Sequence, residues 1–353
     1  MNQIKAYGYF FTKPNGPLER REFLIENLED ANVVVKVAGC GLCHTDLSFY
    51  SGGVKTRKEP PLVLGHEISG EVVAAGSASE NWIGKKVVVP AVLPCGECDL
   101  CKSGRDNICQ SQKMPGNDFN GGFASHLSVP SRFLCEVPQM LDNFSLSHLS
   151  VIADAITTPY QALLRSGLKK GELAIVIGVG GIGTYMVQHA RNAGATVIAV
   201  DIDDERLESA KLAGSKYTVN SRTTPGGDVK KAVRTLVKEN KLPPNKWRVF
   251  ETSGTCEGQN AAYSLLSFAG TIGIIGFTME KLTIRLSNVM AFDADIFGNW
   301  GCSPSHYTNV VKKVLSGEIR IIDFIEQHPL DSINSVISKA LGHQLKKRAI
   351  LVP

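Results

Sequence analysis

The sequence predicts an α/β protein with two domains, an irregular, mostly antiparallel β domain followed by a doubly wound parallel sheet. Its length of 353 residues is sufficient for two domains of ordinary size. Residues 1–150 contain short β-type runs that glycine, proline and asparagine separate. After about residue 155, continuous apolar runs alternate with segments of helical periodicity. The clearest runs of the first half are Val33–Ala38, Val72–Ala75 and Lys86–Pro90.

The second half of the chain repeats a strand–helix order. Leu173–Ile177 is a short continuous apolar run, as expected for a strand that is buried on both faces. Residues 182–193 have helical periodicity, and Gly194 ends this helix. A second helix, from Val229 to Lys238, is amphipathic. Further strands are expected at Thr196–Val200, Val249–Glu251 and Thr271–Ile275, and this alternation indicates a doubly wound parallel sheet.

Two more amphipathic helices are expected near the C-terminus, at Tyr307–Leu315 and Ile333–Leu341. Periodicity alone does not decide whether they extend the sheet domain or return to the first domain. The chain shows no internal repeat, low-complexity segment or long linker that would separate them from the rest.

The composition is that of a soluble globular protein, with 43% hydrophobic and 20% charged residues. The formal net charge of +4 is small for this length and gives no reason to expect a nucleic-acid or membrane partner. The N-terminal segment lacks the apolar core of a signal peptide. The longest apolar run, Leu173–Val187, is too short and too rich in glycine to span a membrane. We therefore expect a cytoplasmic protein.

A glycine-rich turn follows the expected strand at Leu173–Ile177 and opens the expected helix after it. Gly178-Val179-Gly180-Gly181-Ile182-Gly183 fits the G-x-G-x-x-G pattern, and Asp201 ends the next strand. The glycines let the backbone approach a pyrophosphate, which would rest on the free N–H groups of the helix N-terminus. Asp201 would accept hydrogen bonds from the adenosine ribose and repel a 2′-phosphate, which favours NAD over NADP. A tight turn in another α/β fold is the alternative, but the strand–turn–helix context favours a Rossmann domain.

Four of the nine cysteines lie close together in the sequence. Cys95, Cys98, Cys101 and Cys109 can close a tetrahedral thiolate site, in which four sulfurs leave no open position on the metal. This spacing predicts a structural zinc ion. An iron–sulfur cluster is the main alternative, but the bacterial cluster motif has a shorter final gap and a proline after its last cysteine. Free buried cysteines are a further alternative, which the close spacing disfavours.

Two short motifs of the first half contain further candidate metal ligands. Cys43-His44-Thr45-Asp46 ends a β run, and Gly65-His66-Glu67 follows about twenty residues later. With the four cysteines and the glycine turn, these motifs make the chain resemble the zinc-containing medium-chain alcohol dehydrogenases, over nearly its whole length. The resemblance implies a homo-oligomer, a dimer or a tetramer. It also implies a GroES-like catalytic domain at 1–154 and 299–353, with a zinc lobe at 95–109, and a Rossmann NAD-binding domain at 155–298.

The resemblance implies roles for individual residues. Cys43 and His66 would bind a catalytic zinc ion, and Glu67 would lie beside it as a neighbouring acid or a transient ligand. Thr45 would hold the substrate hydroxyl, and His44 would lie near the cofactor pyrophosphate. The other cofactor-binding residues would be Thr158, Gly178, Gly180, Gly181, Ile182, Gly183, Asp201, Arg206, Gly276 and Arg348.

Two positions depart from the pattern of many relatives. Their third zinc ligand is a cysteine six residues before a tyrosine, and the residue six before Tyr160 here is Asp154. A carboxylate is an acceptable zinc ligand with the charge of a thiolate, although it is a harder donor. The alternative is that Asp154 only caps the following helix. Ser48 stands where many relatives have a proton-relaying histidine, which leaves the proton exit open.

The implied reaction is the NAD-linked oxidation of a secondary alcohol, with one catalytic and one structural zinc ion per chain. Zinc would lower the pKa of the substrate hydroxyl, as it does for bound water. Hydride would pass to the nicotinamide, and the proton would leave through Thr45 and the cofactor ribose. A non-catalytic NAD-binding protein with structural zinc alone is a rival interpretation, which a single zinc ion per chain would favour.

Four stretches of the chain resemble, more closely, the 6-hydroxycyclohex-1-ene-1-carbonyl-CoA dehydrogenases of anaerobic benzoyl-CoA degradation. This resemblance implies oxidation of a cyclic allylic alcohol on a CoA thioester to the 6-oxo compound. Lys55, Arg57 and Lys58 form a basic loop that could hold CoA phosphates, and a solvated surface loop is an equal alternative. A polyol or another small secondary alcohol is the alternative substrate. The four stretches are residues 43–50, 113–118, 285–288 and 298–302.

Overall fold

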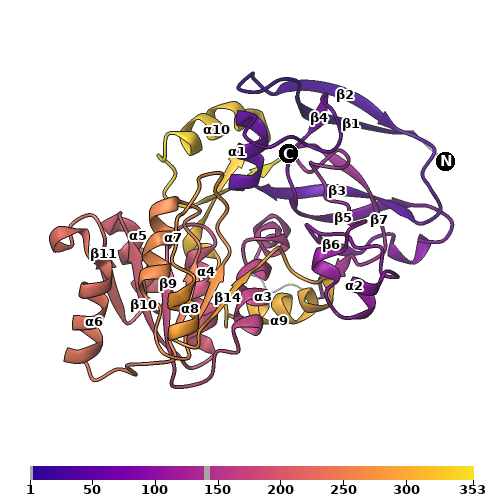
Figure 1. The fold of residues 1–353 in the computed structure, drawn as a ribbon. Helices are drawn as coiled ribbons and strands as arrows, with labels where there is room; N and C mark the ends of the chain where they lie inside the picture. Colours follow the sequence, from indigo (N-terminus) through magenta and orange to yellow (C-terminus); the bar gives the residue numbers. More distant parts are fainter. Residues whose placement is uncertain (1–2, 139–143) are drawn as a thin grey trace. The chain divides into compact units, whose positions relative to one another are not determined.

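The structure, a computed structural model, describes residues 3–138 and 144–353. The chain divides into two compact units, shown in Figure 1. Unit 1 comprises Met1–Thr157, Gly301–Gly317 and Ile321–Pro353, and unit 2 comprises Thr158–Trp300 and Glu318–Arg320. The C-terminal segment therefore belongs mainly to the unit formed by the first half of the sequence.

Unit 1 is built from two sheets with mostly antiparallel pairing. The larger sheet has the order β15-β16-β3-β5-β6-β8, with β7 paired to β3, and the smaller has the order β2-β1-β4. Val33, Val35 and Val37 of β3 enter the core as alternate residues of one strand. The strands are β1 (Ile4–Phe11), β2 (Glu19–Ile25), β3 (Asn32–Gly41), β4 (Leu62–Val63), β5 (Glu67–Ala75), β6 (Lys86–Val89), β7 (His126–Pro130), β8 (Cys135–Glu136), β15 (Ile325–Pro329) and β16 (Arg348–Val352).

Short helices connect the strands of unit 1. The two C-terminal helices, α9 (Tyr307–Leu315) and α10 (Ile333–Leu341), have the bounds expected from the sequence. Both belong to unit 1, which decides the question that periodicity left open. Further helices of unit 1 include α1 (His44–Ser51), α2 (Asp99–Lys102) and the 3₁₀ helix η3 (Leu146–Ala153), while α3 (Thr157–Ser166) starts at its boundary.

Unit 2 is a parallel sheet with helices in the connections. Its six strands have the order β11-β10-β9-β12-β13-β14. Numbered within the unit, this is 3-2-1-4-5-6, the order of the Rossmann fold, so the predicted doubly wound sheet is confirmed. The strands are β9 (Leu173–Ile177), β10 (Thr196–Asp201), β11 (Tyr217–Asn220), β12 (Arg248–Glu251), β13 (Thr271–Ile274) and β14 (Asp295–Gly298).

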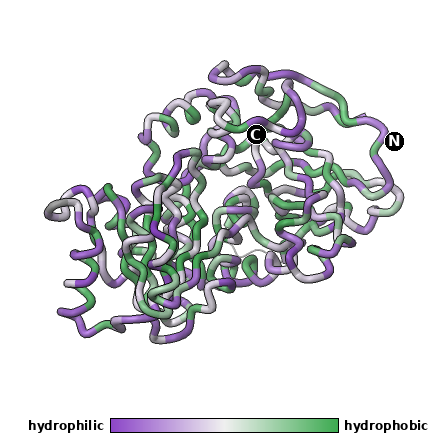
Figure 2. The backbone as a smooth tube through the Cα atoms, in the orientation of Figure 1, coloured by the Kyte–Doolittle hydropathy of each residue, from purple (hydrophilic) through white to green (hydrophobic). Residues whose placement is uncertain are grey.

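Apolar residues determine how the helices of unit 2 pack. The five residues of β9 are all buried, as expected for a central parallel strand. Helix α6 (Val229–Glu239) buries Val229, Val233 and Val237, which lie four residues apart on one face. Figure 2 shows this alternation of hydrophobic and hydrophilic residues along α6. Further helices of this unit include α4 (Gly183–Asn192), α5 (Asp204–Ala213), α7 (Cys256–Ser264) and α8 (Ser287–Ala291).

Among the described residues, no helix combines the length and apolar character that crossing a bilayer requires.

Candidate metal sites and cofactor-binding turn

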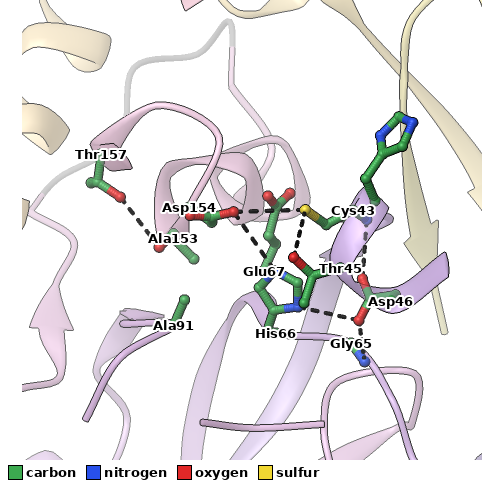
Figure 3. A network of polar contacts seen from close by, with 12 residues as sticks. Cys43, Thr45, Asp46, Gly65, His66, Glu67, Ala91, Ala153, Asp154 and Thr157 are labelled. Atoms are coloured by element: carbon green, nitrogen blue, oxygen red, sulfur yellow. Dashed lines mark hydrogen bonds and ion pairs between the residues drawn. The ribbon is translucent and has the colours of Figure 1, made fainter. Parts of the chain in front are cut away.

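A buried aspartate organises the first two candidate metal ligands. Cys43 is the N-cap of α1, and the third residue of this helix, Asp46, accepts a hydrogen bond from the backbone N–H of Cys43 at 3.0 Å. The same carboxylate accepts from the N–H of Gly65 at 3.1 Å and lies 3.2 Å from Nδ1 of His66 (Figure 3). One side chain therefore holds both the Cys43 turn and the His66 segment.

The contact with Asp46 determines which nitrogen of His66 can bind a metal. A carboxylate accepts hydrogen bonds, so Nδ1 of the ring donates, and in the neutral ring Nε2 has the lone pair that can bind a metal. Nε2 lies 3.7 Å from Oδ2 of Asp154, and Sγ of Cys43 lies 3.7 Å from the same oxygen. A tetrahedral zinc ion with ordinary bond lengths would separate such donor atoms by about 3.4–3.6 Å. Cys43, His66 and Asp154 thus fit three corners of a tetrahedral zinc site.

Negative groups surround the His66 ring, which is 1% exposed. Burial alone would lower the pKa of His66, but Asp46 and the hydrogen bonds to Asp154 and Cys43 outweigh it. The pKa of His66 therefore lies well above its ordinary value. The groups around His66 that accept hydrogen bonds thus favour a positive charge among them, and a divalent metal ion would provide one.

Glu67 follows His66 and belongs to the same ligand cluster, whose potential donor atoms lie within 4.8 Å of one another. It is fully buried and forms a bidentate ion pair with Arg348. Nε of the guanidinium lies 2.8 Å from Oε2, and Nη2 bonds Oε1. Arg348 therefore lies beside the metal cluster in unit 1, and its contact with a cofactor stays a prediction.

The four-cysteine segment forms a second cluster in unit 1. The Sγ–Sγ distances are 3.5 Å for Cys98–Cys101 and Cys95–Cys109, and 3.8 Å for Cys98–Cys109. A tetrahedral zinc ion with four thiolates would give about 3.8 Å. The N–H of Gly96 donates to Cys101 at 3.3 Å, and the N–H groups of Glu97 and Cys98 lower the pKa of Cys95 to about 6. Backbone donors thus favour a thiolate at Cys95, whereas burial and the neighbouring cysteines raise the pKa of Cys101 to about 12, so its thiolate would need the charge of a metal ion.

The glycine turn lies between β9 and α4 at the carboxyl edge of the unit 2 sheet. Gly178 has a φ of +81°, a conformation that side chains disfavour. A Cβ at Gly183 would lie only 1.9 Å from the carbonyl oxygen of Gly178, so only glycine fits there. Beside Gly180 there is open space, and a Cβ would meet only the guanidinium of Arg206, at 3.8 Å. The turn therefore has the shape and the exposed backbone that a pyrophosphate requires.

Asp201 ends β10 next to the glycine turn. Its Oδ2 accepts from the N–H of Val179 at 2.8 Å, and its Oδ1 accepts from the N–H groups of Ile202 and Asp203. Each carboxylate oxygen has two lone pairs, so Oδ2 can accept a further hydrogen bond from a ribose hydroxyl. The acid thus holds the turn in place, and its contact with a cofactor stays a prediction.

The other predicted residues occupy different elements. His44 is an exposed residue at the start of α1 in unit 1, whereas Thr158 is buried in α3 and Gly276 follows β13, both in unit 2. The structure brings Cys43, Thr45, His66, Glu67 and Asp154 together in unit 1. It gathers the glycine turn, Asp201 and Arg206 in unit 2.

The predicted basic loop is tied to a neighbouring loop of unit 1. Arg57 donates from Nη1 to the carbonyl oxygen of Gln112 at 3.0 Å and pairs with Asp118 at 3.2 Å. Lys58 contacts Asn120, whereas Lys55 is exposed and, within the described residues, forms no ion pair. The contacts of Arg57 therefore stabilise this loop, whereas the ammonium group of Lys55 is exposed to solvent.

The role of Asp46 was not predicted from the sequence. The signal was present, because an acid at the third helical position after an N-cap is the pattern of a capping box. Its bonds to Gly65 and His66 join segments about twenty residues apart, and local pattern does not show such contacts.

Comparisons with known proteins agree with both units. A family model described as "Alcohol dehydrogenase GroES-like domain" matches residues 29–139, and one described as "Zinc-binding dehydrogenase" matches residues 181–316. An alcohol dehydrogenase of Geobacillus stearothermophilus is 28% identical over 345 residues, which cover 95% of this chain and 96% of the relative. The crystal structure of the alcohol dehydrogenase from Aeropyrum pernix matches with a TM-score of 0.88 and 27% identity, covering 98% of this chain and all of that one.

One relative has a higher identity over a shorter region. An uncharacterized zinc-type alcohol dehydrogenase-like protein of Haemophilus influenzae is 31% identical over 289 residues, or 81% of each chain. The predicted GroES-like and Rossmann folds are confirmed by these matches. The chain is therefore an enzyme of the zinc-dependent alcohol dehydrogenase family.

Proposed function

We propose that the enzyme oxidises a secondary alcohol to a ketone, with NAD⁺ as the hydride acceptor and with one catalytic and one structural zinc ion per chain. The observation that carries the proposal is the cluster of Cys43, His66 and Asp154, whose donor atoms suit zinc and whose histidine is oriented by Asp46. Three protein ligands and an open position are the arrangement of catalytic zinc sites, whereas four thiolates are structural.

Different residues of unit 1 would bind the metal ion and the substrate hydroxyl. Cys43, His66 and Asp154 would hold zinc, which supplies a Lewis acid that lowers the pKa of a substrate hydroxyl. Thr45, whose Oγ1 lies 3.8 Å from Sγ of Cys43, would hold that hydroxyl and accept its proton. Bound NAD⁺ would supply the hydride acceptor, so the overall reaction would convert an alcohol and NAD⁺ into a ketone, NADH and a proton.

Ser48 offers no clear path for this proton. Its hydroxyl donates to the carbonyl oxygen of His44 at 3.0 Å, within the first turns of α1. The proposed exit therefore runs from Thr45 to the cofactor ribose without passing through Ser48.

Asp201 supports NAD as the cofactor. Its negative charge at the end of β10 would repel a 2′-phosphate, and its free lone pairs would accept from ribose hydroxyls. The cysteine cluster supports a cytoplasmic enzyme, because a reducing compartment keeps its thiols available for zinc.

A direct assay tests this proposal. The purified enzyme should reduce NAD⁺ faster than NADP⁺ in the presence of a cyclic secondary alcohol, and metal analysis should find two zinc ions per chain. A single zinc ion together with no NADH formation would favour the non-catalytic alternative.

We further propose that the substrate is a cyclic allylic alcohol carried on a CoA thioester, as for 6-hydroxycyclohex-1-ene-1-carbonyl-CoA. The four stretches of sequence described above support this choice, and an exposed cation at Lys55 is compatible with a phosphate-rich substrate. A polyol or another small secondary alcohol is the competing substrate, and equal turnover of free alcohols and CoA esters would favour it.

Removing the charge of Lys55 should weaken binding of the CoA ester alone. In Lys55→Ala we expect KM for the CoA ester to rise by up to about fivefold at low salt, because an exposed ion pair contributes about 0.2–1 kcal/mol. KM for a small cyclic alcohol should stay unchanged. The double variant Lys55→Ala/Arg57→Ala should show a larger rise, although loss of the Arg57–Asp118 pair also alters the loop.

Lys5→Ala is the matched control, because Lys5 is an exposed lysine of β1 in the same unit. An equal change of KM for both substrates, or an equal effect of Lys5→Ala, would remove the phosphate-binding role of Lys55.

We also propose that the enzyme is a homo-oligomer, a dimer or a tetramer. Strand β14 ends the unit 2 sheet, and within the described part of the chain its outer edge carries no further strand. Leu286, Met290, Ile296 and Trp300, on or next to α8 and β14, are exposed apolar residues. Light scattering of the purified protein should give a multiple of the 38.1 kDa chain mass, and a monomer would contradict the proposal.

A further inference from the structure

A tyrosine hydroxyl is buried among backbone groups in unit 1. Tyr307 begins α9 and is 1% exposed. Its hydroxyl donates to the carbonyl oxygen of Ala153 and accepts from the backbone N–H of Ala91 at 3.3 Å. Burial raises the pKa of Tyr307 well above its ordinary value, so the hydroxyl keeps its proton as a donor. The hydroxyl therefore links two distant segments of backbone.

One of these segments carries the third candidate zinc ligand. Ala153 ends η3, and its carbonyl belongs to the peptide bond directly before Asp154. Thr157, the first residue of α3, donates from Oγ1 to the same carbonyl at 3.2 Å (Figure 3). Because a peptide unit is planar, holding this carbonyl also holds the N and Cα atoms of Asp154.

The other segment belongs to the sheet that leads to His66. Ala91 lies two residues after β6, which pairs with β5 through Ile68 and Val89. His66 directly precedes β5. The hydroxyl of Tyr307 thus connects the sheet next to His66 with the turn that contains Asp154.

We propose that Tyr307 is a positioning residue for the third zinc ligand, holding Asp154 within reach of Cys43 and His66 through the Ala153 carbonyl. The inference rests on the proposed function, because it requires Asp154 to bind zinc. Oδ2 of Asp154 lies 3.7 Å both from Sγ of Cys43 and from Nε2 of His66. Metal–ligand distances hold within about 0.2 Å, so a small shift of the Asp154 backbone would disturb the site.

The variant Tyr307→Phe tests this role, because it removes the hydroxyl and keeps the buried ring. We expect the zinc affinity of the Cys43–His66–Asp154 site to fall about 10- to 100-fold, the usual effect of losing a group that orients a metal ligand. The four-cysteine site should keep its zinc. Competition with a chromophoric chelator measures both affinities. The visible spectrum of the Co²⁺-substituted enzyme should also change, because it reports ligand geometry.

Tyr9→Phe is the matched control. Tyr9 is a buried tyrosine of unit 1 whose hydroxyl donates to Oδ1 of Asp331 at 2.7 Å, outside the metal clusters. The variant Tyr9→Phe should leave the zinc affinities of both sites and the Co²⁺ spectrum unchanged. The inference is overturned if Tyr307→Phe keeps wild-type affinity at both sites, or if both variants lose zinc from both sites equally.

The wild-type enzyme separates this inference from the proposed function. If the wild type binds a single zinc ion, the proposed function fails and the role of Tyr307 fails with it. If the wild type binds two zinc ions and Tyr307→Phe binds them with the same affinities, only the role of Tyr307 fails.

Discussion

Replacing Asp154 by alanine is expected to remove the catalytic zinc ion and to lower kcat/KM by about a thousandfold or more. A metal acting as a Lewis acid contributes several kcal/mol of transition-state stabilisation, and about 4 kcal/mol corresponds to a factor of a thousand. With Asp154 absent, Cys43 and His66 would provide only two of the three protein ligands. Steady-state kinetics and zinc analysis on the same sample measure both effects.

Asp154→Cys is the informative companion of this variant. The family resemblance implies a cysteine at this position, and a cysteine thiolate carries the same charge as a carboxylate when it binds zinc. We expect this variant to recover the second zinc ion and much of the activity. If Asp154→Ala keeps two zinc ions per chain and wild-type kcat/KM, Asp154 is not a ligand and only caps the following helix.

Replacing Arg348 by methionine is expected to destabilise the folded protein by about 3–5 kcal/mol. The carboxylate of Glu67 has no solvent exposure, and the side chain of Arg348 is only 6% exposed. Removing one member of a buried ion pair leaves the other charge without compensation, and this costs more than losing the pair as a whole. Urea unfolding followed by fluorescence measures the change in the free energy of unfolding.

The double variant Glu67→Gln/Arg348→Met is the control for this prediction. It removes both charges, so it should regain a large part of the stability that Arg348→Met loses. Equal stabilities of the single and double variants would show that the uncompensated charge of Glu67 is not the cause.

Local patterns in the sequence were sufficient for most of the fold. The glycine turn, the four-cysteine cluster and the strands β9 and β10 depend on neighbouring residues, and the structure has them at the expected places. Helices α5 and α7 were not predicted, because their apolar stripes are weak. Their starting signals were nevertheless present, since Asp203 and Thr255 cap them through backbone N–H groups.

Long-range contacts explain what the sequence did not show. Arg348 pairs with Glu67, which lies 281 positions away in the sequence. The hydroxyl of Tyr307 donates to the carbonyl oxygen of Ala153, 154 positions away. Such pairs depend on how sheets and turns pack, so they cannot be predicted from periodicity or motif spacing. Asp154 was found only by counting from Tyr160 within a family resemblance, and the structure brings its carboxylate to Cys43 and His66.

The two clusters of unit 1 offer unlike chemistry to metal ions. One consists of four sulfur atoms, and the other combines a single sulfur with nitrogen and oxygen donors. Soft thiolates retain zinc and similar ions, whereas carboxylate and imidazole also accept harder ions such as Mn²⁺. If Asp154 is the third ligand, an aspartate in place of a cysteine would widen the range of metals that this site accepts. We therefore expect the four-cysteine site to be selective for soft ions such as zinc, and the Cys43–His66–Asp154 site to bind a wider range of divalent ions.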